Sequence, residues 1–269
     1  SHDGTSKWKI SMAWSAIKTE AIIMTSAPFR EADRRYSALT RDFGKVVFTG
    51  RGARKGKAKL AAHLEPYAIV DLEIIRGRRS VTVISVERQH AFRSLMQDLD
   101  RRILTQASLS LIDKHLKEYD HDEILYHLVL DWMNFVDNQE SIEKKQQVLL
   151  LGSFMLRLMQ QLGYEVALAD CIACKERIMP LAFRWHGGKG GLVCSDCVHK
   201  DGQEWFAART IEEEAVKVLR FAREAAYEDI VSTNFERAHV EDFSRIVHDL
   251  MQYHLPMDTS TPFWRGLAV

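Results

Sequence analysis

The chain has 269 residues, enough for two or three structural units with packed cores, and its 46% hydrophobic and 28% charged content excludes a fibrous or wholly disordered chain. The net charge of zero conceals an asymmetry, because residues 1–85 contain 16 Lys and Arg against 8 Asp and Glu, whereas the remainder contains 21 against 29. The resulting charges of +8 and −8 predict a polyanionic partner for the N-terminal part.

The N-terminus lacks the apolar segment of a signal peptide, and no apolar run in the sequence is long enough to span a membrane. We therefore expect a cytoplasmic protein with reduced thiols and no membrane partner. The first residue is not methionine, so part of residues 1–11 is a candidate added tail and Met12 is a candidate natural start.

Residues 12–87 form the first predicted domain, in which short β-rich segments alternate with turns. A short helix is expected at 59–66, between the third and fourth strands. Five strands with a helix at this position are typical of an OB barrel, with another small β-barrel as the alternative. The predicted strands cover 16–26, the two arms of 36–50 around a turn at Asp42–Gly44, 67–75 and 80–87.

From residue 88 the spacing of apolar residues becomes that of helices. The spacings of Asp120 to Glu123 and of Thr210 to Glu213 predict capping boxes, and therefore two helix starts. We expect one helical domain in two parts, 88–170 and 200–269. The predicted helices lie within 90–119, 122–138, 144–164, 211–228 and 236–255, and the predicted core aromatics include Trp132, Phe135, Phe154 and Tyr164.

All the cysteines lie between the two helical parts, as two C-x-x-C pairs separated by 19 residues. Each pair can direct two thiolates at one ion, and the glycines at 187, 188, 190 and 191 suit a tight turn between the pairs. This spacing predicts one structural zinc ion, within an insertion at 171–199. The predicted ligands are Cys171, Cys174, Cys194 and Cys197.

A metal-free knuckle and a redox motif are the alternatives for the cysteine pairs, whereas a reducing compartment disfavours disulfides. Since four thiolates complete a tetrahedral shell, His186 and His199 are expected at the surface. The predicted fold class is thus a multidomain α+β protein: a five-stranded OB-type barrel followed by a helical domain with an inserted four-cysteine zinc knuckle.

Enzyme motifs are missing from the sequence, which contains no Walker A loop, G-x-S-x-G, H-E-x-x-H or dinucleotide fingerprint. His63 and Glu65 match the H-x-E of zinc deaminases, but that family places a proline before its cysteine pair. Asp170 and Val193 stand there instead. We predict that the chain is not an enzyme.

The loop after the third predicted strand carries five positive charges in the nine residues 51–59. Its glycines let the backbone approach a ligand, and its charges can follow a phosphate backbone, although a solvated loop is the alternative. On an OB barrel such a loop commonly binds nucleic acid.

These features together resemble the RecO family of bacterial recombination mediators, over about residues 14–255. The C-x-x-C pairs match the zinc-bearing members of that family. The other segments that carry the resemblance are EADR at 31–34, FGK at 43–45, GRGAR at 50–54, LEPY at 64–67 and FMLRLMQQLGYEV at 154–166.

The resemblance implies a non-enzymatic mediator of DNA repair at the nucleoid, which binds single- and double-stranded DNA and anneals complementary strands. Its implied partners are RecR and single-strand-binding protein (SSB), with RecF as a further candidate, and together they help to load the recombinase. An RNA-binding or ribosome-associated factor is the alternative, since OB barrels and zinc ribbons also serve RNA. The implied DNA-contacting residues are Arg51, Arg54, Lys55, Lys57 and Lys59, with Arg34, Arg35 and Lys45 as secondary candidates and Arg76, Arg78 and Arg79 as an extension or a solubilising turn.

Overall fold

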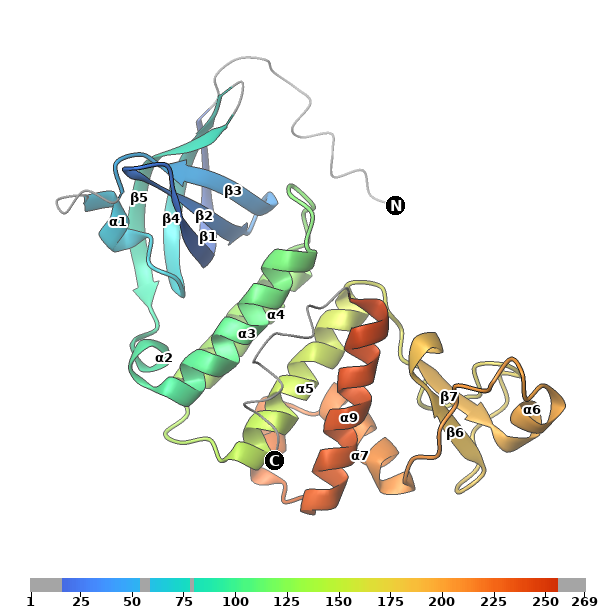
Figure 1. Ribbon diagram of the computed structural model, residues 1–269. Helices are drawn as coiled ribbons and strands as arrows, with labels where there is room; N and C mark the ends of the chain where they lie inside the picture. The colour runs from blue at the N-terminus through green and yellow to red at the C-terminus, as the bar shows by residue number, and fades with distance from the viewer. Residues whose placement is uncertain (1–15, 54–58, 78–79, 256–269) are drawn as a thin grey trace. The chain divides into compact units, whose positions relative to one another are not determined.

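The computed structural model describes residues 16–53, 59–77 and 80–255 (Figure 1). Internal contacts divide the chain between Gln139 and Glu140 into two compact units. Among the described residues, the first unit contains a β-barrel with one short helix between its strands and three helices after it, and the second contains the helices from residue 144 onward and a small two-stranded sheet.

A closed barrel of five strands, in the order β1-β2-β3-β5-β4, forms the core of the first unit. Neighbouring strands are antiparallel except β3 and β5, which pair in parallel at Thr49 and Thr82. This arrangement confirms the predicted OB-type barrel. The strands are β1 (Ala16–Phe29), β2 (Asp33–Thr40), β3 (Gly44–Gly50), β4 (Ala68–Arg76) and β5 (Val81–Ala91), and helix α1 (Lys59–His63) lies between β3 and β4.

Buried and partly exposed residues alternate along the strands, which gives the barrel one face that lines its interior. In β3 the buried residues Val46 and Phe48 alternate with partly exposed neighbours, and the Phe48 ring stacks on Tyr36 at 5.5 Å between centroids. Gly44 ends the β2–β3 turn with φ of +66°, and a Cβ there would lie only 2.0 Å from the Asp120 carbonyl oxygen. A glycine is therefore required by both the turn and the close approach.

Three helices complete the first unit: α2 (Arg93–Gln97), α3 (Leu99–His115) and α4 (Glu123–Asn138). The predicted capping box at Asp120 is wrong, because the N-cap of α4 is Asp122, whose carboxylate accepts from Leu125 N at 2.9 Å. The chain between α3 and α4 instead turns at Tyr119, whose φ is +65°, and this moves the helix start two residues downstream of the expected cap.

One carboxylate connects α3 to the barrel. Asp113 accepts hydrogen bonds from Thr25 Oγ1 at 3.0 Å and Ser37 Oγ at 2.5 Å, and it forms an ion pair with Lys45 Nζ at 3.0 Å. Lys45 Nζ also donates to the carbonyl oxygen of Asp113. Side chains from β1, β2 and β3 thus meet at a single position of the helix.

The second unit packs α5 (Lys144–Gln161) against α7 (Glu213–Glu224), α8 (Tyr227–Ser232) and α9 (Arg237–His254). Gly152 permits the α5–α9 contact, since a Cβ there would lie 2.4 Å from the buried ring of Phe243. The predicted box at Thr210 is also wrong, because α7 follows Glu212, which makes no side-chain cap. Between α5 and α7 lie β6 (Phe183–His186), the 3₁₀ turn η1 (Gly187–Lys189), β7 (Gly191–Cys194) and α6 (Ser195–Lys200).

Burial confirms most of the predicted core aromatics. Trp132 and Phe154 are fully buried and Phe135 nearly so, whereas the prediction for Tyr164 is wrong, because this side chain is 36% exposed. Tyr164 follows the end of α5, where its ring lies 5.3 Å from the His254 ring rather than inside the helix packing. Among the described helices, none combines the length and the apolar character that a membrane span requires.

Candidate metal centre and nucleic-acid interface

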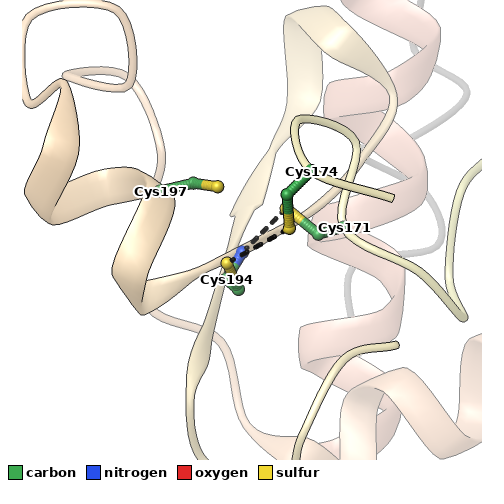
Figure 2. Close-up of side chains that lie close together, drawn as sticks. All are labelled: Cys171, Cys174, Cys194 and Cys197. Atoms are coloured by element: carbon green, nitrogen blue, oxygen red, sulfur yellow. Dashed lines mark hydrogen bonds between the residues drawn. The ribbon is translucent and has the colours of Figure 1, made fainter. Parts of the chain in front are cut away.

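Three short elements bring the four cysteines together. Cys171 and Cys174 lie in a turn after α5, Cys194 ends β7, and Cys197 lies in the first turn of α6 (Figure 2). All four Sγ atoms lie within 4.8 Å of one another, and the Cys174 and Cys194 sulfurs are 3.8 Å apart. The hairpin of β6 and β7 closes the sequence gap between the two pairs.

The cluster has the dimensions of a tetrahedral zinc site. Zinc–thiolate bonds of about 2.3 Å place sulfurs about 3.8 Å apart at the corners of a tetrahedron. Four soft thiolates in a closed shell suit zinc and leave no position for a catalytic water. Within the described ranges this is the one group of three or more His, Cys, Asp or Glu side chains with metal-binding geometry. The residues present therefore fit a structural zinc ion.

Backbone hydrogen bonds shape the first cysteine turn around Cys171. Its Sγ accepts from Ala173 N at 3.4 Å and from Cys194 N at 3.3 Å. Lys175 closes the turn in the left-handed conformation, with φ of +64°, and its N–H donates to the Cys171 carbonyl at 3.0 Å. One N–H of the turn and one N–H at the end of β7 thus point at the sulfur, as a thiolate requires.

Protonation of the thiols differs sharply within the cluster. Burial disfavours the Cys171 thiolate, but the backbone N–H groups that point at it lower its pKa to about 6. Hydrogen bonding to Cys194, together with burial, raises the pKa of Cys197 to about 12, and burial raises the pKa of Cys194. Without a cation, the cluster therefore holds protons that a bound metal would displace.

A small apolar core supports the cysteines, and a histidine that was expected at the surface is buried beside it. Trp205 and Ala208 are buried against Cys171 and Cys197. His186 is not at the surface as predicted: it is only 8% exposed, its ring meets Trp205 edge-on at 5.8 Å, and its Nδ1 accepts from Lys189 N at 3.1 Å. Burial lowers the pKa of His186, whereas His199 is exposed as predicted.

The second candidate site is a pocket of about 440 Å³ on the barrel. It lies where the β1–β2 turn and the β4–β5 hairpin meet strands β2 and β3. OB folds bind oligonucleotides through this strand face and these two loops. The charged lining residues are Arg30, Arg35, Arg51 and Arg76 against Asp33 and Glu118, so the pocket has a net positive charge.

The predicted DNA-contacting residues have different surroundings in the structure, and only some of them line the pocket. Arg35 and Arg51 line the pocket and are exposed. Adjacent strand residues point to opposite faces, and the neighbouring Arg34 donates to Ser26 Oγ at 3.1 Å instead. The charge of Lys45 is balanced by Asp113. Arg54, Lys55, Lys57, Arg78 and Arg79 lie outside the described residues, and only the backbone of Lys59, at the start of α1, is described.

Sequence reasoning missed Phe29, Arg30 and Tyr119, which also line the pocket. Arg30 lies 5.1 Å from the centroid of the Phe29 ring, and Arg76 lies 5.5 Å from that of Tyr119. Arg30 was recognisable as a basic residue in the first loop of a predicted OB barrel. Tyr119 lies 28 residues beyond the end of β5, and no local pattern connects it to the barrel.

Two family sequence models match most of the chain. Residues 12–92 match the sequence model described as "Recombination protein O N terminal", and residues 96–261 match "Recombination protein O C terminal". The DNA repair protein RecO of Caldanaerobacter subterraneus subsp. tengcongensis is 26% identical over 242 residues, which cover 90% of this chain and 94% of the relative. The DNA repair protein RecO of Dehalococcoides mccartyi (strain ATCC BAA-2266) is 24% identical over 247 residues, covering 92% and 94%. Since the two sequence models together span both structural units, the chain belongs to the RecO family of DNA repair proteins.

Proposed function

We propose that this protein is a recombination mediator that binds single- and double-stranded DNA, anneals complementary strands and, with RecR and SSB, helps to load the recombinase. The observation that carries the proposal is the arginine-lined pocket at the oligonucleotide-binding elements of an OB-type barrel, in a chain of the RecO family. Annealing requires two strands to be held together and no covalent step, so the proposed role is not enzymatic.

Phosphate neutralisation is the proposed basis of strand binding. Arg35 and Arg51 supply positive charge at the pocket. In the proposal the loop residues Arg54, Lys55, Lys57 and Lys59 extend that charge along the strand, whereas Arg34, which donates to Ser26 and does not line the pocket, contributes less. Each neutralised phosphate lowers the repulsion between two strands and releases counterions, which favours both binding and annealing.

Protein partners are proposed to use the acidic helical part. A positively charged barrel holds DNA, whereas negatively charged helices repel it and remain accessible to RecR, SSB and, as a further candidate, RecF. In this proposal residues 12–87 form the DNA-binding domain, and residues 88–170 and 200–269 form the two parts of the helical domain. One zinc ion stabilises the insertion at 171–199 between these parts. Its proposed ligands are Cys171, Cys174, Cys194 and Cys197. Zinc would supply folding free energy rather than chemistry there.

Strand annealing tests the proposed function directly. Two complementary oligonucleotides with a fluorescent donor and acceptor are coated with SSB and mixed with the protein, with and without RecR. We expect faster annealing with the wild type, and slower annealing when Arg51, Arg54, Lys55, Lys57 and Lys59 are all replaced by Ala. A wild type that does not accelerate annealing contradicts the proposal, and tighter binding of RNA than of single-stranded DNA in competition favours an RNA-directed role.

A further inference from the structure

Tyr119 reaches the DNA-facing pocket of the barrel from outside the barrel. It belongs to the connection between α3 and α4, yet its N–H donates to the Lys45 carbonyl of β3 at 2.9 Å. The backbones of Glu118 and Lys45 form an isolated parallel β-bridge. Because Gly44 has no side chain, the Asp120 carbonyl can approach β3 closely. The connection is therefore held against β3 by backbone contacts, and the Tyr119 ring is placed at the pocket.

The backbone at the pocket is in an unfavourable conformation. Tyr119 has φ of +65° and Arg30 has φ of +55°, and both residues line the pocket. Bulky residues rarely adopt this region, because the side chain crowds the backbone, and such residues concentrate at binding sites where the surroundings enforce them. The two strained positions come from opposite ends of the first unit's sequence and meet at one pocket.

The side chains at the pocket offer surfaces on which a nucleobase can stack. The Arg76 guanidinium lies over the Tyr119 ring, and the Arg30 guanidinium lies over the Phe29 ring. Unpaired bases stack on aromatic rings and on guanidinium planes, and this contact is tolerant of sequence. The pocket volume of about 440 Å³ lies within the range of small-ligand sites, so a single base can enter it.

We propose that Tyr119, together with Arg76, is a stacking platform for one unpaired nucleobase, through which the pocket favours single-stranded DNA over duplex. Bases in a duplex are already stacked on their neighbours and cannot enter, whereas phosphates are available in both forms. The inference rests on the proposed function, because it assumes that the barrel binds DNA, and it adds the contact that distinguishes the two kinds of strand.

Binding by three variants tests the inference. In Tyr119→Leu the apolar packing stays but the ring is lost, and Tyr119→Phe keeps the ring. Tyr67→Leu is a matched control, because Tyr67, directly before β4, is likewise a half-buried tyrosine with positive φ but does not line the pocket. For a short oligodeoxythymidine we expect Tyr119→Leu to raise Kd by about 5- to 150-fold, with Tyr119→Phe and Tyr67→Leu close to the wild type. Duplex affinity and the salt dependence of binding should stay the same.

An abasic strand of the same length tests the wild type without any substitution. It keeps the phosphates and lacks the bases, so the wild type should bind it more weakly, and Tyr119→Leu should no longer distinguish the two strands. Equal wild-type binding of normal and abasic strands overturns the inference, as does an equal loss of single-strand and duplex binding in Tyr119→Leu. A wild type that binds no nucleic acid overturns the proposed function as well, whereas a wild type that binds DNA without dependence on Tyr119 leaves that function intact.

Discussion

Replacement of Asp113 by Ala should loosen the attachment of α3 to the barrel. The substitution removes the acceptor of two hydroxyl donors, Thr25 and Ser37, and the partner of the Lys45 ammonium. Ser37 is only 5% exposed, so its hydroxyl cannot exchange its partner for water without a local rearrangement. Lys45 is less affected, because it still donates to the main-chain carbonyl of residue 113.

The magnitude follows from these contacts. A hydrogen bond to a charged group contributes about 1.5–3 kcal/mol, and loss of one partner of a buried ion pair costs about 3–5 kcal/mol. The side chains of Lys45 and Asp113 are 13% and 24% exposed, so solvent screens part of their attraction. We therefore expect a loss of about 3 kcal/mol in the local free energy of opening.

Hydrogen exchange measured by mass spectrometry suits this prediction, because two packed units need not unfold in one step. A loss of about 3 kcal/mol corresponds to exchange roughly 150-fold faster in the β2 and β3 peptides. Asp131→Ala, which removes an exposed carboxylate from α4, is the control and should have little effect. Acceleration of less than about threefold in Asp113→Ala would refute the reasoning, since that is the range of an ordinary surface substitution.

Three further predictions follow from the metal centre, the pocket and the helix packing. At neutral pH the metal-free chain should take up one zinc ion and release at least two protons, because two thiols have raised pKa values, and the affinity for zinc should rise with pH. Release of clearly fewer than two protons, measured by calorimetry in several buffers, would contradict this. The Arg35→Ala/Arg51→Ala double variant should flatten the slope of log K against log salt for single-stranded DNA by about 1.4. Arg34→Ala should flatten this slope by less than half of that amount. A double variant with the same slope as the wild type would count against the pocket as the DNA-binding surface. Gly152→Ala should lower stability by about 1 kcal/mol, since overpacking against Phe243 typically costs about 1–3 kcal/mol and outweighs the gain of about 1 kcal/mol in helix propensity. A higher Tm would contradict the packing argument.

Local patterns in the sequence predicted the strands, most of the helical segments and the grouping of the cysteines. Each of these patterns involves residues only a few positions apart in the chain. Alternating apolar residues and turn residues mark a strand and its end, and a spacing of two residues keeps Cys171 near Cys174. Helix starts were less predictable, because two predicted capping boxes with suitable spacing are not used. The carboxylate of Asp122 caps α4 after the turn at Tyr119, and α7 follows Glu212 without a side-chain cap. Several backbone choices compete at such a point, and spacing alone cannot rank them.

Tertiary structure alone decided burial at particular positions and the composition of the pocket. His186 is buried because Trp205, from beyond the second cysteine pair, packs against it, and no pattern near His186 indicates that contact. Arg30 and Tyr119 are 89 residues apart, yet the closed barrel and the α3–α4 connection bring both to one pocket. Contacts of this kind depend on how whole elements pack, whereas the periodicity of a sequence reports only which face of each element is apolar.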